Sequence, residues 1–185
     1  MRRWVVPVTL LLIFVGTLGF LVVKLISFQG ENTKLTRINK QLQQSIDAEP
    51  VALFFIKSTT TNFYLKPYLT RINGKGDRHR KALEALLAGP PSNSNLLAVF
   101  PAGTRVLDLQ VKNGLATVNL NHKATELNVG SQGEDLAVAS IVNTLTKFPD
   151  VFGVKIVIEG KEVESLAGHV DLTDVLRYND RAVEF

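Results

Sequence analysis

The chain has 185 residues, no cysteine, a formal net charge of +4 and 45% apolar residues. This length suits one domain with an appendage and is sufficient to bury a core. Without cysteine, the chain cannot form a disulfide, a thiolate nucleophile, a cysteine-based metal centre or a lipid anchor on an N-terminal cysteine. The positive charge first suggests a nucleic-acid partner. Whether that suggestion holds depends on where the charges lie along the chain.

Residues 1–24 are predicted to form a membrane anchor. Arg2 and Arg3 precede residues 4–23, a run of twenty residues without a charge. Twenty helical residues span about 30 Å, the thickness of the bilayer's hydrocarbon core. By the positive-inside rule the two arginines stay in the cytoplasm, which places the rest of the chain on the extracytoplasmic side. The alternative is a cleaved secretory signal, and under that interpretation the rest of the chain is exported as well.

Residues 25–50 are predicted to form a polar, amphipathic stalk or linker. The spacing of its apolar residues is helical, and Pro50 ends the pattern. About two heptads are present, which leaves a linker helix and a weak self-association stalk both open. The apolar positions are Leu35, Ile38, Leu42 and Ile46.

Residues 51–175 have the alternating pattern of an α/β domain, and 176–185 are predicted to be a C-terminal tail. Asn113-Gly114 between two apolar runs indicates a β-hairpin. Ser131 and Glu134 have the spacing of a capping box at a helix start. The predicted elements in chain order are strands at 51–57 and 64–72, a helix from Asp77 to about 88, strands at 105–111 and 115–121, a helix from Ser131 to about 148, and a strand at 153–160.

This order of elements predicts the fold class. Two helices are expected to cover one face of a mixed or mostly antiparallel sheet, which makes a two-layer α/β (α+β) sandwich. One transmembrane helix is expected to precede it.

The sequence offers no constellation typical of an enzyme. The three histidines are far apart in the sequence, and they form neither an H-E-x-x-H motif nor a pair at helical spacing. They are expected to be surface residues, and Ser131 is explained by capping. No catalytic residue, metal site or cofactor is predicted. The histidines are His79, His122 and His169.

One basic cluster breaks a local rule, because a helix start normally favours anions over cations. Residues 77–81 read Asp-Arg-His-Arg-Lys, and two further cations lie just before them. Cations beside free backbone N–H groups would suit an acidic partner. A solvated basic loop is the simpler interpretation. The candidate binding residues are Arg71, Lys75, Arg78, Arg80 and Lys81.

Four segments together resemble the GerMN domain over residues 51–170. The helix end ALEALLAGP (82–90), the turn FPAGT (100–104), the strand GLATVNL (114–120) and the stretch from 138 to 160 follow its order and spacing. The family is named for a bacterial spore germination and sporulation protein, and its fold resembles ring-building modules of secretion machines. The sporulation protein has two copies and its relatives are lipoproteins, whereas this chain has one copy and no cysteine. Asn119 and Asn121 stand where Asp and Ser are common.

The resemblance implies a non-enzymatic binding or assembly module of the bacterial cell envelope. Combined with the anchor, it predicts a single-pass membrane protein with an extracytoplasmic domain. Its expected partners are envelope proteins, including copies of the same chain. A sensor that contacts peptidoglycan, another acidic wall polymer or anionic lipid through the basic cluster is the alternative. Nucleic acid is not an expected partner.

The charges within the predicted domain are distributed unevenly along the sequence. Residues 51–81 contain seven basic residues and one acidic residue, whereas 82–185 contain eight and thirteen. A basic first part and an acidic remainder favour contact between copies or docking on an acidic surface.

Overall fold

A computed structural model describes residues 24, 28, 34–40, 50–72 and 76–184. The chain divides into two compact units, Met1–Asp47 and Ala48–Phe185. In the first unit, residues 34–40 are helical and exposed, including Leu35 and Ile38 of the predicted stripe. Leu42 and Ile46 lie outside the described residues, as does the predicted span 4–23. Within the described ranges, no helix is long and apolar enough to cross a membrane.

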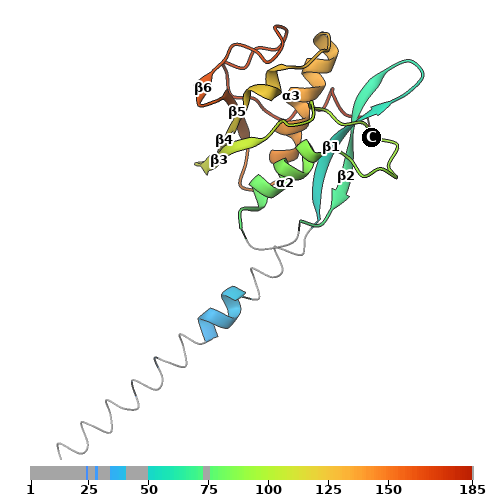
Figure 1. Cartoon of the computed structure of the whole chain (residues 1–185). Coiled ribbons are helices and arrows are strands. Elements are labelled where there is room, and N and C mark those ends of the chain that lie inside the picture. The colour runs from blue at the N-terminus through green and yellow to red at the C-terminus, as the bar shows by residue number, and fades with distance from the viewer. Residues whose placement is uncertain (1–23, 25–27, 29–33, 41–49, 73–75, 185) are drawn as a thin grey trace, which may run out of the picture. The chain divides into compact units, whose positions relative to one another are not determined.

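The second unit has the predicted mixed α/β composition (Figure 1). The elements appear in the predicted order, and a 3-10 helix and a short sixth strand add to them. They are β1 (Val51–Ser58), β2 (Phe63–Thr70), α2 (Arg78–Ala88), β3 (Val106–Lys112), β4 (Leu115–Leu120), η1 (His122–Thr125), α3 (Ser131–Leu145), β5 (Gly153–Ile158) and β6 (Lys161–Glu162).

The described strands form two sheets, where the sequence analysis expected one. β1 and β2 form an antiparallel pair, and the other strands form a sheet of order β3-β4-β5-β6. β4 and β5 are parallel, and the other neighbours are antiparallel, so the larger sheet is mixed. The single-sheet arrangement is therefore wrong, because pairing between strands distant in sequence leaves no local signal.

Two turns of the larger sheet have the backbone that hairpins favour. Asn113 and Gly114 have φ values of 50° and 78°, as a two-residue turn of this type requires. The predicted hairpin between β3 and β4 is confirmed. Glu159 and Gly160 repeat the same pair of φ values between β5 and β6.

A β-bulge interrupts the alternation of buried and exposed side chains in β3. The register between β3 and β4 shifts between Val106 and Asp108. The extra residue, Leu107, is 46% exposed, whereas Val106 and Leu109 are buried. A bulge of this kind changes the side of the sheet on which the following side chains lie.

Helix α3 packs against both sheets. A helix that is apolar on all sides belongs in a core, and nearly every residue of α3 from Leu136 onward is buried. The main core joins α2 and α3 to β1 and the larger sheet. A smaller second core lies on the other side of β1 and consists of Phe54, Leu65, Leu136, Ala139 and Ala182.

The predicted capping box of α3 is wrong. Gly130 is the N-cap and makes no side-chain cap, and Ser131 is the first residue of the helix. The side chain of Glu134 is fully buried and bonds to the segment at 166–169 instead. The helix ends at Leu145, about one turn before the predicted end.

The C-terminal tail is part of the second unit. Leu176 and Val154 exchange two backbone hydrogen bonds of 2.9 Å. The N–H of Leu65 in β2 donates to the carbonyl of Ala182 at 2.7 Å. Residues 176–184 therefore continue the packing of the domain, and they extend the edge of the smaller sheet.

Candidate functional site

The basic cluster of the sequence analysis does not form one surface. Arg71 follows the end of β2, and the other described members lie in the first turn of α2. Lys75 lies outside the described residues. Arg78, Arg80 and Lys81 are close in sequence, but the structure places each in a different environment.

Arg80 is bound within the domain. Its Nε donates to Glu84 Oε1 at 2.8 Å, and its Nη2 donates to the carbonyl of Val106 at 2.8 Å. Nη1 lies 3.4 Å from the carbonyl of Leu107. These bonds join α2 to the start of β3, which gives Arg80 a structural role.

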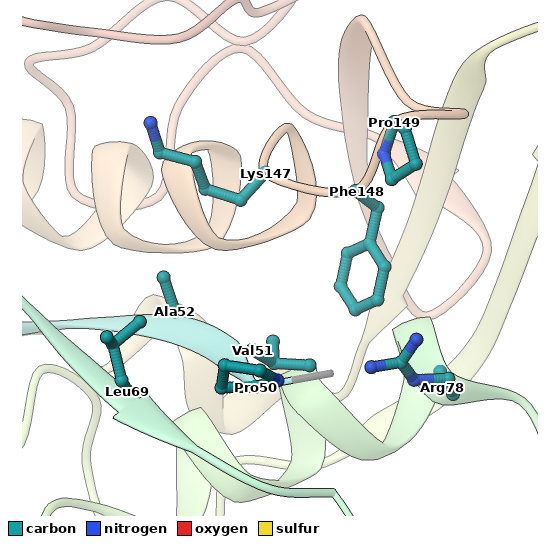
Figure 2. Close-up of a pocket in the computed structure, with 8 residues that line it drawn as sticks. All are labelled: Pro50, Val51, Ala52, Leu69, Arg78, Lys147, Phe148 and Pro149. Carbon is teal, nitrogen blue, oxygen red and sulfur yellow. The ribbon is translucent and has the colours of Figure 1, made fainter. Parts of the chain in front are cut away.

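Arg78 lines a small pocket of about 240 Å³ at the start of β1 (Figure 2). Its guanidinium carbon lies 5.8 Å from the centre of the Phe148 ring, a cation–π contact. The ammonium of Lys147, another lining residue, lies 4.3 Å from the ring centre of Tyr178. The remaining lining is apolar and comprises Pro50, Val51, Ala52, Leu69 and Pro149.

Arg71 and Lys81 line a larger groove of about 520 Å³ between the smaller sheet and α2, named here the Arg71–Lys81 groove. Its inner part is apolar, and the ring of Tyr68 meets that of Phe55 edge-on with centres 6.3 Å apart. Within the part of the chain that the structure describes, its lining includes two cations and no carboxylate. The other lining residues are Leu53, Thr70, Ile72, Ala85, Gly89 and Pro91.

The start of α2 is held by Asp77, where the predicted helix begins. Asp77 Oδ1 accepts from the backbone N–H of His79 at 2.9 Å, the geometry of an N-cap. His79 itself is not the surface histidine that the sequence suggested. Its Nδ1 lies 2.9 Å from Asp77 and its Nε2 3.0 Å from Asp150, and its ring packs on Phe148. This histidine therefore joins the start of α2 to the turn before β5.

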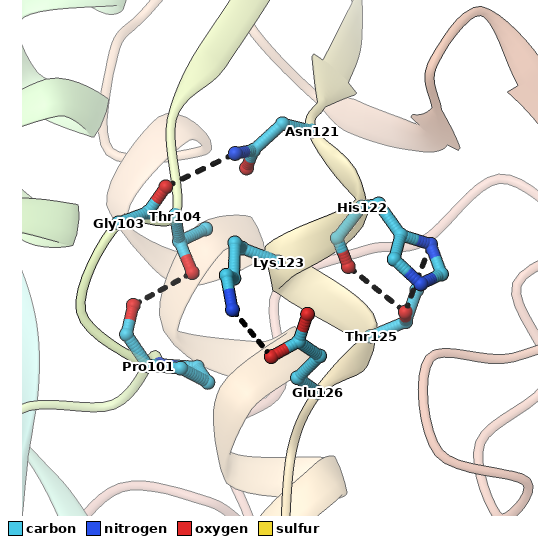
Figure 3. Close-up of polar contacts among 8 residues, drawn as sticks. All are labelled: Pro101, Gly103, Thr104, Asn121, His122, Lys123, Thr125 and Glu126. Carbon is cyan, nitrogen blue, oxygen red and sulfur yellow. Dashed lines mark hydrogen bonds and ion pairs between the residues drawn. The ribbon is translucent and has the colours of Figure 1, made fainter.

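The motif residues around the FPAGT turn serve the fold (Figure 3). Thr104 donates from its hydroxyl to the carbonyl of Pro101 at 2.8 Å. Asn121 Oδ1 accepts from the N–H of Arg105, and Asn121 Nδ2 donates to the carbonyl of Gly103. The side chain at the end of β4 thus clamps the turn that precedes β3.

A comparison with family models identifies the chain. The model described as "Germane: Sporulation and spore germination" matches residues 52–164, more than half of the chain. The chain belongs to the Germane family. The expected resemblance to GerMN domains is thereby confirmed, and with it the relation to sporulation and germination proteins.

Solved structures carry the same Germane fold. The tandem GerMN domains of the sporulation protein GerM from Bacillus subtilis match with 24% identity and a TM-score of 0.62, over 73% of this chain and 47% of that one. The first GerMN domain of GerM alone matches with 26% identity and a TM-score of 0.57, over 70% and 96%. A putative lipoprotein from Clostridium perfringens matches with 22% identity and a TM-score of 0.52, over 69% and 86%. A search of curated protein sequences found no significant match.

The other residues of this Germane domain that were weighed for chemistry lie in separate surroundings. His122 is exposed near Thr125, and His169 binds the buried carboxylate of Glu134. Ser131 is exposed in the first turn of α3. Within the described ranges, no group of three or more His, Asp or Glu side chains is arranged to hold a metal ion.

Two of the predicted site residues therefore line the same cavity in the structure. Arg71 and Lys81 share the groove, Arg78 lines a separate pocket, and Arg80 is committed to β3. The apolar inner part of the groove has no local signal in the sequence, because it is built from β1, β2 and α2 together. The Arg71–Lys81 groove is the candidate site.

Proposed function

We propose that the chain is a membrane-anchored binding or assembly module on the extracytoplasmic side of a bacterial cell envelope. Membership of the Germane family supports a role among sporulation and germination proteins. The uncharged run 4–23 after Arg2 and Arg3 supports the anchor and its orientation.

The observation that carries the binding role is the Arg71–Lys81 groove. A concave surface with an apolar inner part and a few convergent charged groups is typical of recognition sites. Among the described residues that line the groove, both charged groups are cations, so the ligand is expected to present a carboxylate or phosphate beside an apolar group.

The location is tested with reporter fusions. A periplasmic-type phosphatase fused after Phe185 is expected to be active and a fluorescent protein at the same place dark. The reverse pattern would place the domain in the cytoplasm and refute the proposal.

The binding role is tested by crosslinking in intact envelopes, followed by recovery of the chain. Stable protein partners that are lost when Arg71 is replaced by Glu support the module. Partners that persist after this substitution would exclude the groove as the binding site.

A second candidate function is a sensor of an acidic wall polymer or of anionic lipid. The excess of basic residues in 51–81 favours it. Sedimentation of the full chain with purified cell wall, or with anionic vesicles but not neutral ones, distinguishes this function from assembly with protein partners.

A further inference from the structure

We infer that the Arg71–Lys81 groove receives the acidic segment 159–174 of a second copy of this chain. This inference rests on the proposed binding function and names its partner. The resulting contact joins two different surfaces, one from each copy.

The charges of the two surfaces are complementary. Among the described residues that line the groove, the charged ones are Arg71 and Lys81. The segment 159–174 contains five acidic residues, all exposed, and Lys161 is its one lysine. Complementary charges of this kind steer association and select the partner. The acidic residues are Glu159, Glu162, Glu164, Asp171 and Asp174.

The apolar character of the groove also has a counterpart. Directly after Asp174, the side chain of Val175 is 45% exposed. The neighbouring Leu172 is buried and fixes the end of the segment to the domain. Val175 therefore presents an apolar side chain next to a carboxylate, the combination that the groove suits.

The groove and the β6 part of the acidic segment lie apart on the domain. Figure 1 shows β6 at the end of the domain opposite to the last residues of β2 and the first turn of α2. From β6 the segment runs back to the start of β5, where Leu176 pairs with Val154. The β6 part of the segment is therefore too far away to meet the groove of its own copy. Between copies the groove and the segment form a head-to-tail contact, which leaves one groove and one segment available for further copies.

The contact is expected to be weak in solution and sensitive to salt. Its charged groups are solvent-accessible, and exposed charges are screened beyond about 8 Å at physiological ionic strength. Anchoring on one membrane raises the effective concentration of the copies and compensates for the weak affinity.

Charge reversal tests the inference with the full chain in detergent micelles. The double variant Arg71→Glu, Lys81→Glu is expected to raise the dissociation constant of self-association, measured by sedimentation velocity, at least about tenfold. The double variant Glu164→Lys, Asp174→Lys should do the same. An equal mixture of the two variants should associate again, because each reversed groove then meets a reversed segment.

A matched control carries the same change in net charge outside the groove. Lys66→Glu with Lys112→Glu replaces two exposed lysines, one on β2 and one on β3, and should leave self-association within about twofold. Far-UV circular dichroism checks that every variant is folded. Equal loss in the control and in the groove variant would overturn the inference.

The absence of cysteine permits a direct test of geometry in vesicles that contain the full chain. Thr70→Cys lies in the groove and Val175→Cys at the acidic segment. Oxidation should crosslink a mixture of these two variants and neither variant alone. Crosslinking of Thr70→Cys to itself would show a symmetric contact and overturn the head-to-tail arrangement.

One outcome separates this inference from the function on which it rests. Suppose that the full chain stays monomeric at every concentration while envelope crosslinking that depends on Arg71 recovers another protein. The proposed binding function is then supported, and the inference that the partner is a second copy is refuted. If the chain binds anionic vesicles and neither itself nor a protein, both proposals fail.

Discussion

Glu134 gives the sharpest test of how this fold is held together. Its carboxylate is fully buried and accepts four hydrogen bonds from a segment more than thirty residues away. Oε1 accepts from the N–H groups of Leu166 and Ala167 at 2.9 and 2.8 Å. Oε2 accepts from the N–H and the ring Nδ1 of His169 at 2.8 and 3.0 Å.

Replacing Glu134 with Gln keeps the shape and removes one acceptor. The new NH₂ group then faces two of the four donors, whichever way the amide is turned. Each buried donor without an acceptor costs about 1–3 kcal/mol, so the variant should lose roughly 2–6 kcal/mol of unfolding free energy. At about 2.1 cal/mol/K per residue for the second unit, this loss corresponds to roughly 7–21 °C in melting temperature.

Acid should reduce this difference. Burial raises the pKa of Glu134, but the hydrogen bonds from Ala167, His169 and Leu166 outweigh burial and hold the pKa below its ordinary value of 4.5. Because the folded pKa is lowered, the stabilisation is fully present above the ordinary value and is lost as the pH falls through the folded pKa. The Gln variant does not titrate, so its stability should approach that of the wild type below pH 4.5.

Thermal unfolding followed by far-UV circular dichroism at pH 7 and at decreasing pH measures both effects. Glu126→Gln is the control, because its ion pair with Lys123 is exposed and should contribute at most about 0.5 kcal/mol. Hydrogen exchange should quicken at 166–169 in the Glu134 variant alone. A Gln variant within 1 kcal/mol of the wild type at pH 7 would falsify the account of the buried carboxylate.

Three further predictions concern the family motifs and the tail. Asn121→Ala should cost roughly 2–4 kcal/mol in urea unfolding, because it leaves the N–H of Arg105 and the carbonyl of Gly103 without side-chain partners; a loss below 1 kcal/mol would contradict the clamp. Gly114→Ala should destabilise the domain by more than about 1 kcal/mol, because φ is 78° and a Cβ would stand 1.9 Å from the Phe152 ring; Gly160→Ala, at the same φ in open space, is the milder control. Truncation after Val175 should make the domain sensitive to limited proteolysis, because it removes the reciprocal bonds between Asn143 and Asn179 and exposes the second core; wild-type resistance of the truncated chain would show that the tail is dispensable.

The longer elements of the domain could be predicted because each has a local signal. Asp77 caps α2, Asn113-Gly114 forms the hairpin, and apolar spacing marks both helices. The contacts that could not be predicted are those between residues far apart in the sequence. Asp150 meets His79 across 71 positions, and the segment at 166–169 takes the carboxylate of Glu134 away from its expected cap.

The same reasoning explains why the basic cluster of the sequence is not a cluster in space. Successive residues of a helix are turned by about 100°, so Arg78 and Arg80 point in directions about 200° apart. Arg78 accordingly meets Phe148, whereas Arg80 meets the start of β3. Lys81 is turned toward the groove where β2 also delivers Arg71. Helical geometry alone could have predicted that the cations of α2 point in different directions. That Lys81 and Arg71 line the same groove follows only from the packing of α2 on the smaller sheet. The groove that results is apolar within and basic at its sides, which is the reason to expect a ligand there that carries an acid beside an apolar group.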